Sequence, residues 1–219
     1  MSKKVLSIPL WQWLAMLSLC LLFVSMPQID IYISSLFFRD RFIGNGTLIE
    51  TLLYDSVKPL LILSFVGAIV LWLYNRYIAK ENLLGFTGRK LIFVLLSLLI
   101  GAGLIVNAIL KENLGRARPA QTTIFEGTLP FTPAFIPTQH DGYSFTSGHA
   151  AAAFSLLAFA YLARRHRAFW ISLVISYGSA VGVARISAGG HFFSDVVVSF
   201  FIVYIVTTIL YNKVLKDEM

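Results

Sequence analysis

Charged residues are scarce in this chain of 219 residues, since Asp, Glu, Lys and Arg together make up only 13% of it. Soluble domains carry about 25% charged residues, whereas 57% of this chain is hydrophobic. The composition excludes an ordinary soluble domain and indicates a membrane protein. Cysteine is almost absent, and the single Cys20 excludes both a disulfide within the chain and a cysteine-based metal site.

Six apolar stretches are suited to cross a bilayer, which takes about 20 residues of helix. The predicted spans cover residues 8–26, 59–75, 91–110, 149–163, 168–184 and 193–211. The first span follows two lysines and is open to interpretation as a signal peptide, but its long apolar run and poor cleavage site favour an uncleaved helix. We therefore predict an all-α fold, with residues 1–219 forming a single six-helix transmembrane domain.

The basic residues orient this bundle. If the N-terminus lies in the cytoplasm, eleven of the 18 Lys and Arg residues fall on the cytoplasmic side and seven on the outer side. This bias agrees with the positive-inside rule. The net charge of +7 is then explained by topology together with an outer basic cluster, and no nucleic-acid partner is required.

Two outer segments are long. Residues 27–57 contain the sequence IDIYISSLFF, for which we predict an amphipathic helix lying at the membrane interface. Residues 112–146 are rich in Pro, Thr, Phe and Gly, and loops of this length are usually functional or disordered. The aromatic content favours a packed lid or a wall of a substrate site. His140 and Asp141, near the end of this loop, are interpreted as structural.

Polar residues gather where the predicted spans reach the outer side. They end the third and fifth spans and open the fourth and sixth, so the alternation of the spans brings them to one face. The residues are Lys111, Arg118, Ser147, Gly148, His149, Arg185, His191 and Asp195.

The cations in this set point to a phosphate ligand. Arg118 and Arg185 carry guanidinium groups that match phosphate oxygens through two parallel hydrogen bonds, and Lys111 adds a point charge. Ser147 and Gly148 stand at a predicted helix N-terminus, where free N–H groups and the helix dipole favour an anion. With these cations, the site needs no metal, and no carboxylate cluster is present to hold one.

The histidines add chemistry to the phosphate site. His191 and Asp195 are four residues apart and lie on one face if the segment is helical. We expect Asp195 to hydrogen-bond one imidazole nitrogen, which leaves the other nitrogen free to attack. Histidine can form covalent intermediates. His149 has no carboxylate nearby in the sequence and suits the role of general acid.

Each residue has a simpler interpretation when taken alone. Ser147 is an ordinary helix cap, while Lys111, Arg116 and Arg118 are ordinary interface anchors. Tyr54 is interpreted as a packing or interface aromatic. An anion transporter is the main alternative of another class, but transporters usually place their sites near the bilayer midplane. The polar residues here lie at helix ends, which favours an enzyme.

The pattern resembles that of the type 2 phosphatidic acid phosphatase superfamily, a family of integral-membrane lipid phosphatases. Its motif has three parts: Lys, six residues, Arg-Pro; then Pro-Ser-Gly-His; then Ser-Arg, five residues, His, three residues, Asp. The chain matches the first part at 111–119, three of four positions of the second at 147–149, and the third at 185–195. Thr146 replaces the motif proline, and we expect it to cap the following helix. Ala184 replaces the motif serine, whose role is lost or taken by Ser187.

The resemblance implies a lipid phosphatase without a cofactor. His191 would be the nucleophile that forms phosphohistidine, Asp195 its partner and His149 the acid. The implied phosphate-binding residues are Lys111, Arg118, Ser147, Gly148 and Arg185.

The sequences GRARP, GGHFFSDVV and IDIYISSLFF are similar to the bacterial branch that removes phosphate from lipid A. This similarity implies a membrane lipid phosphate as the substrate and an active site on the periplasmic face of the inner membrane. A phosphatase for undecaprenyl pyrophosphate or phosphatidylglycerophosphate remains an alternative, as does a lipid phosphotransferase. The sequence does not set the oligomeric state.

Overall fold

Helices make up most of the regular structure. The computed structural model describes residues 4–6, 8–139 and 142–215. The α-helices are α1 Leu10–Ser25, α2 Gln28–Ser35, α3 Leu48–Tyr74, α4 Gly88–Leu96, α5 Glu112–Leu114, α6 Gly148–Ser155, α7 Leu157–Leu162, α8 Arg167–Ser187 and α9 Phe193–Val214. The π-helices are η1 Asn75–Ala79 and η3 Ser97–Lys111, and the 3-10 helices are η2 Leu83–Gly85, η4 Pro119–Gln121 and η5 Thr123–Phe125.

Two short antiparallel hairpins complete the described structure. They pair β1 (Lys4–Val5) with β2 (Ile8–Pro9), and β3 (Phe38–Arg39) with β4 (Arg41–Phe42). The predicted all-α fold is confirmed, because these strands are only two residues long; one hairpin precedes α1 and the other lies between α2 and α3.

Hydroxyl side chains fix the starts of two helices that matter for the site. The Thr47 hydroxyl accepts a hydrogen bond from the Glu50 N–H (3.3 Å) at the start of α3. The Ser147 hydroxyl accepts one from the Ala150 N–H (3.4 Å) at the start of α6. Both bonds satisfy N–H groups that have no partner inside the helix.

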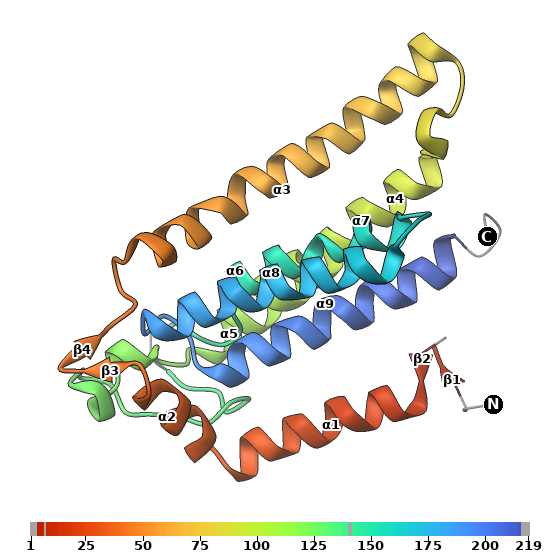
Figure 1. The fold of residues 1–219 in the computed structure, drawn as a ribbon. Coiled ribbons are helices and arrows are strands. Elements are labelled where there is room, and N and C mark those ends of the chain that lie inside the picture. Colours follow the sequence, from red (N-terminus) through yellow and green to blue (C-terminus); the bar gives the residue numbers. More distant parts are fainter. Residues whose placement is uncertain (1–3, 7, 140–141, 216–219) are drawn as a thin grey trace.

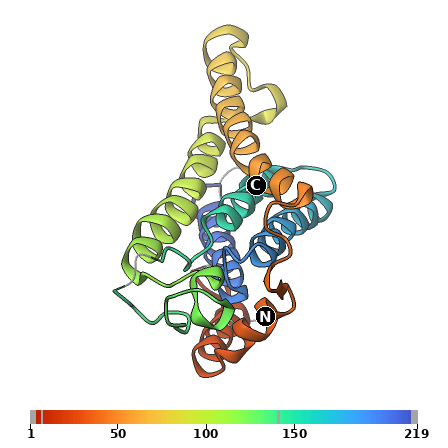
Figure 2. The same ribbon diagram turned by 90° about the vertical axis from the view of Figure 1, so that its left-hand side faces the viewer.

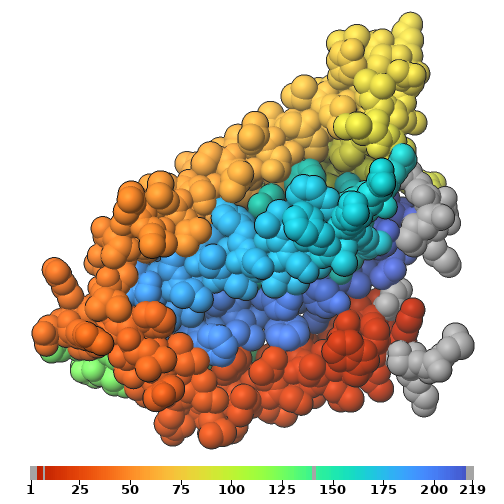
Figure 3. Space-filling view, viewed as in Figure 1, coloured from red at the N-terminus to blue at the C-terminus, as the bar shows by residue number. Residues whose placement is uncertain are grey.

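The centre of the molecule is formed by η3, α6, α8 and α9, which run side by side (Figure 1). Small residues of α6, such as Ala150 and Ala151, pack against larger ones of the neighbours, including Val106 and Val203, and all four are fully buried. Small side chains allow helices to approach closely in a membrane. Helices α3 and α1 flank this centre on opposite sides (Figures 1 and 3).

The predicted count of six spans is not confirmed. In the part of the chain that the structure describes, four helical stretches are long and apolar enough to cross a membrane: Leu48–Ala79, Gly88–Gln121, Arg167–Ser187 and Phe193–Val214. The count rises to five if α1 and α2, which meet at 81°, are taken as one broken span. The predicted fourth span is the shorter apolar stretch Gly148–Leu162, which is divided between α6 and α7.

The boundary predicted for the second span was wrong. That span was expected to begin at Pro59, but α3 begins at Leu48 and carries Pro59 in its interior. The Thr47 cap starts the helix early, and polar residues interrupt the apolar ones in its first turns, which hides these turns from a search for continuous apolar runs. The outer segment is therefore shorter than residues 27–57, and the first turns of α3 lie beside the polar residues of the neighbouring helix ends.

The helix predicted in IDIYISSLFF exists as α2, but its two faces are not simply polar and apolar. Tyr32 is exposed, whereas Asp30 and Ser34 are buried.

The long loop after α5 is packed, as predicted. Its Phe125 ring lies 5.2 Å from Phe38 and 5.3 Å from Phe42, between ring centroids. The loop is thus held against the β3–β4 hairpin by aromatic contacts.

The contact between α8 and α9 at Gly182 gives a test of the packing. A Cβ atom at Gly182 would overlap Val196, whereas one at Gly67 in α3 meets nothing within 4 Å. We expect Gly182→Ala to lower the free energy of unfolding by about 1–3 kcal/mol, and Gly67→Ala to leave it unchanged or raise it by up to about 1 kcal/mol. Thermal unfolding in detergent measures both, and equal stability of the two variants would contradict this packing.

Candidate active site at the outer helix ends

The structure brings the predicted polar residues together at one end of the bundle. They come from the end of η3, the start of α6, the end of α8 and the start of α9, which lie at the same end in Figure 1 and face the viewer in Figure 2. The charges of Lys111, Arg118 and Arg185 all act on His149, and His191 lies close enough to interact with it as well. The convergence expected from alternating spans is therefore present in the structure.

Asp195 is the most constrained carboxylate of the cluster and is fully buried. Its Oδ1 accepts a hydrogen bond from Nη1 of Arg116 (2.6 Å). Its Oδ2 accepts bonds from the Ser144 hydroxyl (2.6 Å) and the Phe192 N–H (2.8 Å). A buried charge needs such compensation. Both oxygens are thus fixed by donors from three different parts of the chain.

His191 is held differently from the prediction. Its Nδ1 lies 2.7 Å from the carbonyl oxygen of Ser144 and 3.5 Å from Oδ2 of Asp195. A carbonyl only accepts, so Nδ1 carries the proton and Nε2 keeps the lone pair. The Ser144 carbonyl therefore accepts the short hydrogen bond that we expected Asp195 to accept. The Asp195 carboxylate lies farther from the ring and acts on it through its negative charge. Burial lowers the pKa of His191, so the ring is neutral at pH 7.

Arg116 was interpreted as an interface anchor, and that interpretation was wrong. Its side chain is 1% exposed and pairs with two carboxylates, Asp195 and Asp30 of α2 (Nη2 to Oδ2, 2.8 Å). Its Nε donates to the Thr132 carbonyl (2.9 Å), and its guanidinium lies 4.2 Å from the centroid of the Phe192 ring. The Arg-Pro of the motif singles out Arg118, and no sequence signal marks Arg116 as buried and paired.

Helix α3 adds residues that sequence reasoning missed. Glu50 forms an ion pair with Arg185 (Oε1 to Nη1, 2.7 Å). The Tyr54 ring stacks on His149 with 4.0 Å between centroids, and the Arg185 guanidinium lies 4.8 Å from the Tyr54 centroid. The early start of α3 places these residues in the cluster, and the apolar pattern alone did not reveal it.

Several donors of the cluster are available to an anion. Among the described residues, the side chains of Lys111 and Arg118 have no hydrogen-bond or ion-pair partner, and Nε of Arg185 is buried without one. Gly148 packs closely against η3, since a Cβ there would lie 2.7 Å from Oδ1 of Asn107 and 3.6 Å from Nζ of Lys111. Cations outnumber free carboxylates here, which favours binding of a phosphate-like group.

The expectation for Thr146 changes, whereas Ser147 caps α6 as its simpler interpretation predicts. Thr146 does not cap α6; its hydroxyl lies 3.5 Å from the Val106 carbonyl, and Ser147 is the cap. Ser147 is buried, and its oxygen serves that cap. Ser187, considered as a substitute for the missing serine at Ala184, donates back to the Ala184 carbonyl (2.9 Å). His140 and Asp141 lie outside the described residues.

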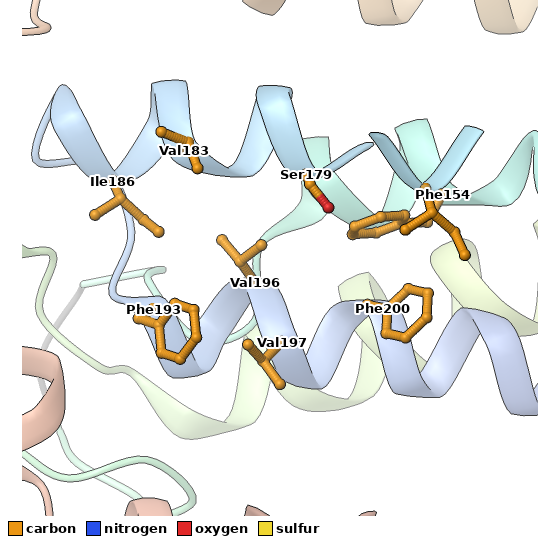
Figure 4. A pocket seen from close by; sticks show the side chains of 9 residues that line it. Phe154, Ser179, Val183, Ile186, Phe193, Val196, Val197 and Phe200 are labelled. Atoms are coloured by element: carbon orange, nitrogen blue, oxygen red, sulfur yellow. The ribbon is translucent and has the colours of Figure 1, made fainter. Parts of the chain in front are cut away.

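An apolar cavity of about 220 Å³ lies between α6, α8 and α9 and is separate from this cluster (Figure 4). Figure 4 shows Val183 and Ile186 of α8 facing Phe193, Val196 and Phe200 of α9. Ser179 supplies the one side-chain hydroxyl in the lining. The cavity contains none of the predicted site residues and offers no cation to a phosphate. In the described parts of the chain, no group of three or more His, Cys, Asp or Glu residues is placed to hold a metal.

The chain is similar to one known protein family and to several known proteins. Residues 90–218 match the PAP2 superfamily. The chain is 34% identical over 205 residues to the lipid A 4'-phosphatase of Francisella tularensis subsp. novicida, with 90% of each chain covered. It is 35% identical to the lipid A 4'-phosphatases of Rhizobium etli (85% of this chain and 78% of the relative) and Rhizobium leguminosarum (85% and 86%). No solved structure matches the chain significantly.

The hydrogen bond between His191 and Ser144 predicts a tautomer. We expect His191 to carry its proton on Nδ1 and to stay neutral as the pH falls through 6.5, because burial lowers its pKa from that ordinary value. Nitrogen-15 NMR of histidine-labelled protein in detergent distinguishes the tautomers, and the signal is assigned by its loss in His191→Ala. A proton on Nε2 at neutral pH would contradict the geometry.

Proposed function

The chain belongs to the PAP2 superfamily, and we propose that it removes a phosphate group from lipid A at the periplasmic face of a bacterial inner membrane. Membership of this family makes the protein a membrane-embedded phosphatase, that is, a phosphoric monoester hydrolase. The observation that carries this proposal is the buried His191, whose Nδ1 is engaged by Ser144 (2.7 Å) and whose Nε2 is left to react among cations. The names of the relatives, lipid A 4'-phosphatases, support lipid A as the substrate.

The phosphate group is held by charges and by the start of α6. Arg118 and Lys111 offer donors without partners among the described residues, and Arg185 offers its buried Nε. Gly148 allows the phosphate to approach the first N–H groups of α6, while Ser147 holds that helix end in place. These groups stabilise the charge of the transferring phosphoryl group.

The reaction proceeds in two displacements. In the first, Nε2 of His191 attacks phosphorus, the bond from phosphorus to the lipid oxygen breaks, and protonated His149 donates its proton to that oxygen. Burial lowers the pKa of His149 to about 4, and the cations around it add to this effect. A phosphate dianion bound among these cations favours the protonated form. Asp195 stabilises the positive charge that develops on His191.

In the second displacement, water takes the place of the lipid. His149, now neutral, accepts a proton from the water molecule while the water oxygen attacks phosphorus. The phosphorus–nitrogen bond breaks, Nε2 of His191 recovers its electron pair, and inorganic phosphate leaves. His149 is protonated again for the next cycle.

His191 is the residue whose loss tests this mechanism. We expect His191→Ala to fold and to lose phosphate release from a detergent-solubilised lipid phosphate by at least about a thousandfold, because no other group supplies the nucleophile. The matched control is His166→Ala, since His166 is exposed and outside the cluster. Release of free phosphate at the wild-type rate by His191→Ala would rule out the mechanism.

The lipid substrate is tested separately in cells. We expect mass spectrometry of lipids from cells with and without the enzyme to show lipid A lighter by one phosphate group when the enzyme is present. Phosphatidylglycerophosphate and undecaprenyl pyrophosphate should stay unchanged. A change in either of these lipids with intact lipid A would reject the lipid A assignment. Transfer of the phosphate to another lipid would show that the enzyme is a phosphotransferase and not a hydrolase.

A further inference from the structure

Asp30 and Arg116 take no chemical part in the reaction proposed above. Both are nevertheless buried, and they are connected through Asp195 to its nucleophile, His191. Asp30 comes from α2, more than 160 residues before Asp195 in the sequence, and its side chain is 1% exposed. Its Oδ1 accepts from the Ser194 N–H (2.8 Å). Its Oδ2 accepts from the Ser194 hydroxyl and from Nη2 of Arg116 (2.8 Å). Asp30 is thereby bound to the first turn of α9.

Arg116 connects Asp30 to Asp195 in a line of alternating charges. Nη1 donates to Asp195 and Nη2 to Asp30, so the guanidinium is shared between two carboxylates. Burial raises the pKa of Asp30 and Arg116 opposes this shift; three donors on its two oxygens favour the ionised form. Two carboxylates and one guanidinium then leave one negative charge behind His191.

This charge balance matters for the proposed reaction at His191. The inference therefore rests on the proposed function. Arg116 with Asp195 alone would be neutral and would offer little to a histidine that gains positive charge. We propose that Asp30 and Arg116 are positioning residues: Arg116 fixes the Asp195 carboxylate, and Asp30 offsets the charge of Arg116 so that Asp195 still stabilises phosphorylated His191. Neither residue touches the substrate, so their effect falls on the chemical step and not on phosphate binding.

The test is Asp30→Asn, which removes the charge and keeps the shape. We expect kcat for lipid phosphate hydrolysis to fall by about ten- to a hundredfold, the loss typical for an outer partner of a reacting histidine. We expect KM, and the inhibition constant of inorganic phosphate, to change by less than about threefold, since the phosphate-binding cations are untouched. A merely structural role would not separate kcat from KM in this way.

Asp40→Asn is the matched control, because Asp40 is an exposed aspartate in the turn between β3 and β4, just after α2. It should keep wild-type kcat. A folded Asp30→Asn variant with kcat within about twofold of wild type, or with its loss confined to KM, would overturn the inference. Wild-type protein without any phosphatase activity would instead overturn the proposed function, so the two failures are distinguishable.

A double variant tests the charge balance itself. Asp30→Asn with Arg116→Gln restores one negative charge behind His191 but removes the donor that fixes Asp195, so we expect its loss of kcat to be smaller than the product of the two single-variant losses. If the loss of kcat in the double variant equals the product of the losses in the two single variants, the charge balance is contradicted. If Asp30→Asn does not fold, Asp30→Glu takes its place: it keeps the charge, and we expect its kcat to lie within about tenfold of wild type. A larger loss of kcat in the folded Asp30→Glu variant would also overturn the inference.

Discussion

The buried ion pairs from Asp30 through Arg116 to Asp195 are the constraint on which the outer end of this bundle depends. Removing three charges from water is costly unless each finds its partners with good geometry. The pairs therefore require α2, the segment after α5 and the start of α9 to meet at one point. Ser144 adds the end of the long loop to the same point. Segments that are apolar-poor and far apart in sequence are in this way held in one arrangement.

The arrangement determines what His191 is able to do. Because Asp195 is occupied by Arg116, Ser144 and the Phe192 N–H, the nearest acceptor for the imidazole is the Ser144 carbonyl. The ring is fixed with Nδ1 toward the protein, and its other nitrogen is left for the phosphate side of the site. Arg185 is fixed by Glu50 and His149 by Tyr54. Helix α3 therefore positions the proposed phosphate-binding cation and the proposed acid, as the ion pairs position the proposed nucleophile.

Sequence alone located Lys111, Arg118, His149, Arg185, His191 and Asp195, because polar residues at the ends of apolar helices are few and easily recognised. It did not identify Arg116, Asp30 or Glu50. Their ion-pair partners lie 79 to 135 residues away, and no periodicity links such distant positions. The starts of the spans were misjudged for a related reason: a Thr cap and three turns with interspersed polar residues extend α3 to Leu48, and a break at Leu156 divides the fourth stretch. Hydropathy measures neither caps nor breaks.

The most direct measurement of this account is the chemical form of the phosphoenzyme. Rapid quenching of the reaction under alkaline conditions, which preserve phosphohistidine, followed by peptide mass spectrometry and phosphorus-31 NMR, identifies both the residue and the ring nitrogen that carry phosphate. The account predicts phosphate on Nε2 of His191, since Nδ1 donates its proton to Ser144. Phosphate on Nδ1 of His191, on His149 or on a residue of another type would contradict it.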